Sequence, residues 1–187
     1  VYLMLESITR AKEETKLKNP SLGDDQLESI AKDIGLGSLK YPLLARENAK
    51  LVTFDWQSAL DFNGQAAPYI QYAHVRCNSI LRKANAHSSN LSGAKFDYAL
   101  DPAEVELIEL ISRFPTEVQR AAAEFKPLII ASIAYETAKA FTSFYDKCPV
   151  IQAEENIRNA RLQLVMAAKQ TMANGLRLLG IQAPEVM

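Results

Sequence analysis

Apolar residues recur every three or four positions along most of this chain, which is the period of a helix with one buried face. The pattern predicts a first helix that ends at about Lys18 and a second that begins at Asp25. Asp25 followed by Glu28 fits a capping box, in which each side chain bonds to backbone N–H groups at the helix start. Gly35 and Gly37 are expected to end this second helix.

Three stretches lack a clear helical period. Residues 39–50 predict either a further helix or an irregular turn, and Leu51 to Trp56 have a strand-like composition, so we expect them to be extended. Residues 85–101 are rich in Ser, Asn and Gly. They predict a loop between helices, with a composition that allows disorder at its centre.

A strong helix start follows this loop. Asp101 supplies an N-cap, Pro102 suits the first position, and Glu104 completes a capping box. The helix is expected to run to about Arg113, after which Pro115 should open another short helix.

Two longer helices are predicted near the carboxyl end. One begins at Pro127 and ends at Cys148, and the other runs from about Ala153 to Leu179, with Gly180 well suited to leaving it. Together the elements predict an all-α helical bundle with little or no sheet.

The stretch from Phe62 to Lys83 is the most unusual part of the chain, because aromatic and basic residues share one predicted helix. Pro68 suits a first helical turn, so the helix should begin close to Ala67. One face carries apolar residues at helical spacing and predicts a core stripe: Ile70, Ala73, Cys77, Ile80, Leu81 and Ala84.

A second face of this helix offers rings and cations: Tyr72, Arg76, Ser79 and Lys83, with Tyr69 one turn above. Such a face can hold phosphates by charge and stack unpaired bases on its rings. The alternative is an ordinary solvated face whose tyrosines close the edge of the core. The pattern by itself leaves both interpretations open.

Composition limits the classes of function. With 187 residues, 48% of them apolar, the chain can bury the core of one domain, or of one domain with a short appendage. A formal net charge of −1 argues against a generic nucleic-acid binder, so any RNA affinity should come from local basic faces and fall with salt. No run approaches the roughly 18 apolar residues of a membrane span, and we infer a cytoplasmic protein with no membrane partner.

Groups for catalysis are scarce. The chain has no glycine-rich phosphate loop, no H-E-x-x-H pair and no nucleophile elbow. Cys77 and Cys148 have no partner at metal-ligand spacing and are expected to be core thiols. His74 is expected to be a hydrogen-bonded structural residue, and His87 lies in the predicted loop. The residues alone therefore predict no catalytic residue and no metal site.

Longer segments resemble one known family. Residues Phe54 to Ala84 closely resemble the junction between the catalytic and anticodon-binding domains of arginyl-tRNA synthetases, which are class I aminoacyl-tRNA synthetases. Residues Ala140 to Val150 and Arg161 to Met187 resemble the carboxyl end of the same family, and the residues before Phe54 resemble its last catalytic-domain helices. The resemblance thus covers nearly the whole chain.

This resemblance implies a carboxyl-terminal fragment of an arginine–tRNA ligase. Residues 1–65 would be the tail of the catalytic domain and the junction, and residues 66–187 would be the helical, DALR-type anticodon-binding domain. The full-length enzyme, expected to be a monomer, would attach arginine to tRNA(Arg) using ATP with magnesium. The fragment lacks the H-I-G-H and K-M-S-K-S type motifs, so we expect it to bind tRNA but no cofactor, and to be inactive alone.

The resemblance also suggests roles for individual residues. Tyr145 would stack on an anticodon base, and Met187 would bring the chain end beside the anticodon loop. Pro149 stands where some members have a second aromatic residue, and residues 159–162 echo the motif that names the domain only loosely. The other candidate tRNA contacts lie on the helix that begins near Ala67: Tyr69, Tyr72, Arg76, Arg82 and Lys83.

Two other classes of function stay open at this point. One is a non-enzymatic helical protein-interaction module, which would bind a partner protein through the same aromatic and basic faces. The other is a self-contained helical enzyme, against which the scarcity of histidines speaks. A salt-sensitive affinity for RNA would separate the family interpretation from the interaction module.

Overall fold

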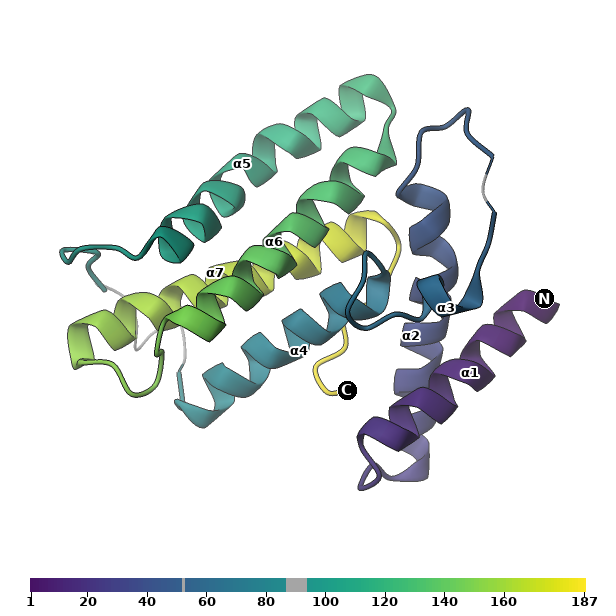
Figure 1. The fold of residues 1–187 in the computed structure, drawn as a ribbon, viewed down its shortest axis with the longest axis horizontal. Coiled ribbons are helices and arrows are strands. Elements are labelled where there is room, and N and C mark those ends of the chain that lie inside the picture. The colour runs from purple at the N-terminus through teal and green to yellow at the C-terminus, as the bar shows by residue number, and fades with distance from the viewer. Residues whose placement is uncertain (52, 87–93) are drawn as a thin grey trace.

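The structure, a computed structural model, describes residues 1–51, 53–86 and 94–187. All regular secondary structure in these ranges is helical (Figure 1). This confirms the predicted all-α class. The helices are α1 (Tyr2–Lys18), α2 (Asp24–Leu44), α3 (Trp56–Ala59), α4 (Ala67–Lys83), α5 (Pro102–Glu124), α6 (Pro127–Lys147) and α7 (Glu155–Leu178).

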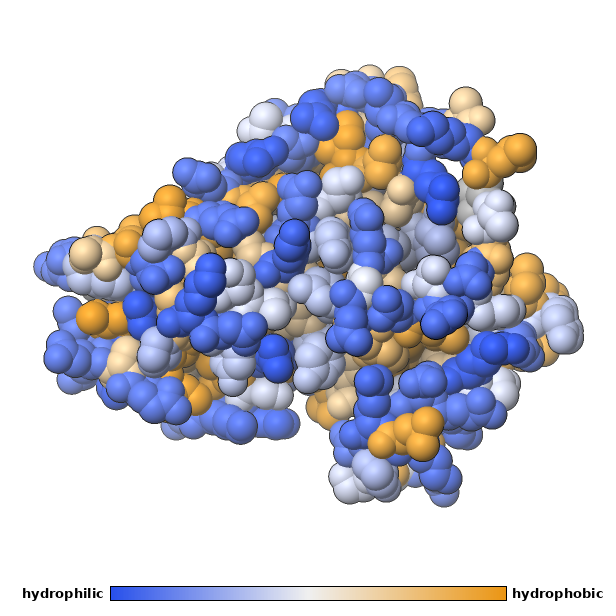
Figure 2. Space-filling model, in the orientation of Figure 1, coloured by the Kyte–Doolittle hydropathy of each residue, from blue (hydrophilic) through white to orange (hydrophobic). Residues whose placement is uncertain are grey.

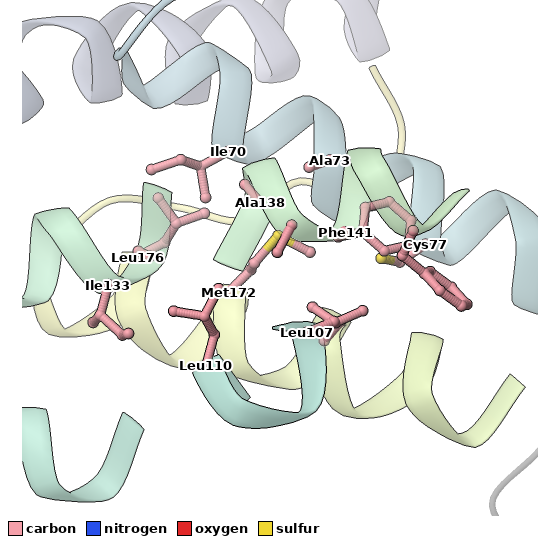
Figure 3. Packing of buried hydrophobic residues seen from close by; sticks show 14 of the residues in the cluster. Ile70, Ala73, Cys77, Leu107, Leu110, Ile133, Ala138, Phe141, Met172 and Leu176 are labelled. Atoms are coloured by element: carbon pink, nitrogen blue, oxygen red, sulfur yellow. The ribbon is translucent and has the colours of Figure 1, made fainter. Parts of the chain in front are cut away.

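Helices α4 to α7 form the main bundle. Helix α6 packs against α4, α5 and α7, and α7 also packs against α4 (Figure 1). In Figure 3 the core side chains of the four helices converge, with Ile70 and Cys77 from α4 facing Phe141 from α6 and Met172 from α7. The predicted α4 stripe is confirmed as buried, apart from Ala84, which is half-buried.

Both cysteines lie in this core. Cys77 and Cys148 are buried, and burial raises the pKa of the Cys148 thiol to about 11. The pKa of Cys77 is also raised, again because burial disfavours the thiolate. The expectation of core thiols is therefore confirmed.

Helices α1 and α2 pack against each other beside the bundle (Figure 1). A small apolar cluster lies between them, made by Ala11, Ile30, Ala31 and Ile34. Gly35 lies at their contact, where an added Cβ would stand 2.8 Å from the Ile8 backbone. The side chain of Tyr41 on α2 is buried in the main core, and its hydroxyl donates a hydrogen bond to the Ala131 carbonyl at 3.1 Å.

The prediction that Gly35 and Gly37 end the second helix was wrong. Helix α2 continues to Leu44 and includes Pro42. At both glycines a neighbouring element comes too close for a side chain. For Gly37, an added Cβ would lie 3.0 Å from the Ile181 side chain. Of the two alternatives left open for residues 39–50, a helix or an irregular turn, the helix is found for the part up to Leu44.

The capping box predicted at Asp25 is also wrong. The N-cap of α2 is Gly23, with no side-chain cap, and Asp24 and Asp25 both lie inside the first turn. Carboxylates there are still favourable, because they face the positive end of the helix dipole. At α5, by contrast, the predicted capping box is present, with Asp101 as N-cap and Glu104 bonding back to its N–H at 2.8 Å.

Pro115 does not open a separate helix. It lies inside α5, which runs on to Glu124 and ends at Phe125 with a positive φ of 53°. Leu107 and Leu110 before the proline and Ala121 after it are all buried against the core. Burial on both sides of the proline outweighs the one backbone hydrogen bond that it removes.

The remaining boundaries agree with the predictions to within two residues. Helix α6 begins at Pro127 and ends before Cys148, and Gly180 follows α7 with a φ of 66°. Residues 53–55 and Leu51 form no strand, and Trp56 begins α3. The predicted disorder within residues 85–101 and the position of His87 fall largely on residues 87–93, which are outside the described residues.

Hydrophilic side chains dominate the face shown in Figure 2, with apolar ones scattered among them. This is what the polar faces of amphipathic helices produce when their apolar stripes meet inside. Among the described residues, no helix is both long and apolar enough to cross a membrane.

Candidate nucleic-acid interface

Helix α4 begins at Ala67, as predicted, and Pro68 lies in its first turn. The apolar stripe of α4 turns inward, so the helix period places Tyr72 and Arg76 on the outer side. Tyr72 is 44% exposed, and Arg76 is half-buried beside it. Their spacing of four residues is one helical turn, which lets the two side chains meet.

Helix α6 brings a second tyrosine to the same place. The guanidinium carbon of Arg76 lies 4.8 Å from the ring centre of Tyr145 and 5.4 Å from that of Tyr72. The Tyr145 ring is 40% exposed, and Phe141 packs one turn earlier at 6.3 Å. One arginine thus lies between two exposed rings that come from different helices.

These three side chains line a hollow of about 700 Å³. We call it the α4–α6 hollow. Its walls are α4, the end of α6, the loop that follows α6, and the last described residue, Met187: Tyr72, Val75, Arg76, Ser79, Ile80, Lys83, Tyr145, Asp146, Cys148, Pro149, Val150, Ile151, Gln152 and Met187.

Five of the seven predicted tRNA contacts line this hollow. Within the part of the chain that the structure describes, none of the ion pairs involves Arg76 or Lys83. Both cations are therefore available to an anion from outside. The five are Tyr72, Arg76, Lys83, Tyr145 and Met187.

The other two residues lie elsewhere. Tyr69 is half-buried, with its ring 5.4 Å from that of Tyr135 and its hydroxyl donating to Thr142 Oγ1 at 3.3 Å. The helix turns by about 300° over three residues, so Tyr69 does not share the face of Tyr72 as closely as the spacing suggested. Arg82 is exposed at the end of α4 and is not part of the wall.

Met187 reaches the hollow at the end of a non-helical segment, residues 181–187, which we call the tail. The side chain of Met187 also packs against the small cluster between α1 and α2. The Asn19 amide donates to the Met187 carbonyl at 3.4 Å. His74 contacts the tail through Nδ1, 2.9 Å from the Pro184 carbonyl, which confirms its structural role. Burial lowers the pKa of His74, because the charged imidazolium is disfavoured in this site.

The loop after α6 is held by Arg161 and Glu104, which the sequence analysis did not connect with each other or with this loop. Arg161 on α7 donates through Nη1 to the Pro149 carbonyl at 2.8 Å. Its Nε and Nη2 donate to the two carboxylate oxygens of Glu104, at 2.9 and 3.3 Å. The Glu104 side chain is fully buried and also accepts a hydrogen bond from the Tyr98 hydroxyl at 2.7 Å.

The pKa values around this pair follow from its contacts. Burial acts to raise the pKa of Glu104, but hydrogen bonds from Arg161, the Asp101 N–H and Tyr98 outweigh it and lower the pKa. Burial, followed by the bond to Glu104, raises the pKa of Tyr98 to about 12. Glu104 is thus an ionised carboxylate at neutral pH, and Tyr98 and Arg161 remain donors to it.

The chemistry of the hollow is that of binding. Rings can stack with bases, and a guanidinium and an ammonium can hold phosphates. Across the described ranges, no group of three or more His, Cys, Asp or Glu side chains is arranged to hold a metal ion. His74 is 2% exposed and already bonded to the tail.

One family model and its relatives match most of this chain. A family model described as "DALR anticodon binding domain" matches residues 70–187. The arginine–tRNA ligase of Thermococcus sibiricus is 47% identical over an alignment of 188 positions that covers 97% of this chain and 29% of that protein. The enzyme of the same name from Pyrococcus furiosus is 45% identical and spans 99% of this chain and 30% of its own length.

Solved structures agree. The arginyl-tRNA synthetase of Thermus thermophilus matches all of this chain with a TM-score of 0.91 and 35% identity, over 32% of that protein. The synthetase from Plasmodium falciparum matches with a TM-score of 0.83 at 21% identity, a likeness of fold. The chain spans about a third of the length of the relatives that it matches.

Proposed function

Because this chain belongs to the DALR anticodon-binding domain family, we propose that it binds the anticodon region of tRNA(Arg) as part of a longer arginine–tRNA ligase. The two curated relatives described above carry that enzyme name, and each is about three times as long as the matched part. We propose that the remainder of such a protein binds arginine and ATP with magnesium and performs the aminoacylation. This chain contributes the grip on the tRNA.

One observation supports this assignment above the others: Arg76 lies between two exposed tyrosine rings in a hollow of about 700 Å³. An unpaired base can stack on an exposed ring, at about 1–3 kcal/mol per base. A guanidinium beside the ring adds charge for the adjoining phosphate. Anticodon bases are unpaired and splayed, which is the form of RNA that such a surface recognises.

Individual roles follow from position. Tyr145 at the end of α6 is the stacking platform for one anticodon base, and Tyr72 offers a second ring on α4. Arg76 and Lys83 contact phosphates inside the hollow, and Arg82 contacts the backbone just outside it. Met187 supplies an apolar edge against a base. Tyr69 supports this surface from within, through its contacts with α6.

Among the described residues, no cluster of three or more His, Cys, Asp or Glu side chains is arranged to hold a metal ion. The chain contains no glycine-rich phosphate loop. Activation of arginine is therefore assigned to the remainder of the longer protein, which we propose acts as a monomer in the cytoplasm. The domain boundary near residue 65 separates that part from the anticodon-binding part.

The test is a binding series with an unmodified tRNA(Arg) transcript and the same transcript with its middle anticodon base replaced. We expect the replaced transcript to bind more weakly. Tyr145→Ala should weaken binding of the correct transcript by about 5- to 150-fold, which is the stacking energy of one base, and remove most of the difference between the two transcripts. Binding is measured by fluorescence anisotropy.

Phe125→Ala provides the matched control, because Phe125 is an aromatic residue that is 81% exposed and lies at the far end of α5. It should leave both affinities unchanged. Equal binding of the two transcripts by the unaltered chain, or no binding at low salt, would contradict anticodon recognition and favour the protein-interaction module.

A further inference from the structure

Helix α4 carries a third row of side chains, distinct from the core stripe and from the face in the hollow. Gln71 Nε2 donates to the Gln182 carbonyl at 2.9 Å, and His74 Nδ1 lies 2.9 Å from the Pro184 carbonyl. Asn78 Nδ2 donates to the Glu185 carbonyl at 2.8 Å. Each bond goes from an α4 side chain to the backbone of the tail.

The spacing of this row matches the tail it holds. Residues 71, 74 and 78 recur at three and four positions, so they lie along one line on the helix. The tail runs beside that line, and the three donors meet the carbonyls of Gln182, Pro184 and Glu185 in the same order along the chain. Gln71 and His74 are almost fully buried, so their bonds to the tail replace bonds to water.

At the Asn78 end of the row, one lysine bonds to both the row and the tail. Lys169 on α7 donates through Nζ to Asn78 Oδ1 at 2.9 Å and to a Glu185 carboxylate oxygen at 2.8 Å. Asn78 is therefore held as a donor toward the tail, and Glu185 is held by both its backbone and its side chain. Met187 is two residues further on, at the edge of the α4–α6 hollow.

We propose that Gln71, His74 and Asn78 are positioning residues that fix the tail so that Met187 forms one edge of the RNA-binding hollow. The inference rests on the proposed function. These three side chains bond to backbone carbonyls of the tail. They therefore fix the path of the tail backbone and place no requirement on which side chains the tail carries. One helix thus presents Tyr72 and Arg76 to the RNA on one side and aligns a further element of the site on the other.

Asn78 is the residue on which to test this. It is half-buried and, of the three residues in the row, binds the tail nearest to Met187, so Asn78→Ala removes a positioning contact without opening the core. The matched control is Asn174→Ala. Asn174 lies on α7, accepts a hydrogen bond from Gln170 and makes no hydrogen bond to the tail.

The experiment is a double-mutant cycle on binding of the tRNA(Arg) transcript, with Asn78→Ala, Met187→Ala and the pair. We expect Asn78→Ala to weaken binding about 3- to 10-fold, the effect of one or two hydrogen bonds, while Asn174→Ala changes nothing. If Asn78 acts through Met187, the double variant binds no more weakly than Met187→Ala alone. Losses that multiply, or Asn78→Ala binding as tightly as the unaltered chain, would overturn the inference.

A second measurement needs no RNA. Amide hydrogen exchange at Ala183 and residues 185–187 should speed up in Asn78→Ala and stay unchanged in Asn174→Ala, since only the first removes a hydrogen bond to the tail. Unchanged exchange in Asn78→Ala would overturn the positioning role. If the unaltered chain fails to bind the transcript, the proposed function fails instead, and the exchange result still decides whether the row holds the tail.

Discussion

At the scale of single residues, the buried pair of Glu104 and Arg161 is the most consequential contact in the molecule. Glu104 is fully buried, and the Arg161 side chain is 13% exposed. Together they connect the start of α5, helix α7 and the loop at Pro149 that walls the hollow. A buried carboxylate is stable only while its donors remain, so the network depends on each member.

Arg161→Ala should therefore lower the free energy of unfolding by about 3–5 kcal/mol at neutral pH, because it leaves the Glu104 carboxylate buried without its cation. The difference between the unaltered chain and the variant should be largest above the ordinary glutamate pKa of 4.5 and shrink as the pH falls through the lowered pKa of Glu104. The sign follows because a lowered pKa stabilises the fold only while the group is ionised. Urea unfolding across a pH series measures this.

Arg120→Ala is the control for that series. Arg120 is 53% exposed and pairs with Glu117 and Glu124 on the surface of α5, so its loss should cost no more than about 1 kcal/mol at any pH. A loss at Arg161 as small as the loss at Arg120, or one independent of pH, would contradict the burial argument.

At the scale of elements, the contact between α1 and α2 depends on the absence of a side chain at Gly35. Ser7 Oγ donates to the Gly35 carbonyl at 2.7 Å, and a Cβ at Gly35 would stand 2.8 Å from backbone atoms of Ile8. Backbone cannot swing aside as a flexible side chain can. A larger residue here must move one whole helix.

Gly35→Ala should lower the free energy of unfolding by about 1–3 kcal/mol through this clash, although alanine favours the helix by up to about 1 kcal/mol. Trp56, the single tryptophan, reports the movement independently, because the Arg10 guanidinium on α1 lies 4.9 Å from its ring centre. We expect a change in Trp56 fluorescence together with the loss measured by urea unfolding. Lys16→Ala, on the exposed side of α1, should change neither. A Gly35→Ala chain as stable as the original would mean that α1 is not fixed at this contact.

At the scale of the whole molecule, charge is nearly balanced, with 21 basic and 22 acidic residues. The proposed RNA contact therefore depends on a local set of basic residues on the second half of α4, Arg76, Arg82 and Lys83, and not on an overall attraction. A small number of phosphate contacts gives moderate affinity and permits release. It also means that the slope of log affinity against log salt concentration can be estimated from the number of contacts.

Three phosphate contacts to single-stranded RNA predict a slope of about −2 in a plot of log affinity against log salt, at about −0.7 per contact. Lys83→Ala should make the slope less negative by about 0.7, while Arg113→Ala on α5, away from the hollow, should not change it. Filter binding from 50 to 200 mM salt measures both. A slope near zero, or an equal effect of the two variants, would show that the α4 cluster does not contact phosphate.

Local chemistry explains how much of the fold the sequence predicted. The starts of α4, α5 and α6 were correct because each has a proline in the first turn, and the α5 capping box involves residues three apart. The continuations through Gly35 and Pro115 were missed because distant packing decides them. No local rule shows that α1 will lie against Gly35, or that residues on both sides of Pro115 will be buried.

In the candidate site, too, features within one helix were predicted, and contacts between distant segments were not. Tyr72, Arg76 and Lys83 were found from spacing along one helix, and Tyr145 and Met187 entered only through resemblance to a family. The meeting of Arg76 with Tyr145, and of Arg161 with Glu104, joins helices that are far apart in sequence. Spacing alone does not encode such pairs. Asn78 and Lys169 were missed for that reason, since each looks like an ordinary solvated residue until the tail is placed beside it.

The position of the tail has a consequence for how the protein is made. Gln71 and the carbonyl it binds are separated by 111 residues, so this seam between the α1–α2 pair and α4 waits for a segment that leaves the ribosome much later. At about 5–20 residues per second, the delay is roughly 6 to 22 s. During that time the amide of Gln71 has only its bond to the Asp33 carbonyl, at 3.2 Å, and the imidazole of His74 has water in place of the Pro184 carbonyl. The hollow that we propose binds RNA is thus complete only once the tail has been made, and a nascent chain whose α4 and α6 have already formed still lacks the edge that Met187 supplies.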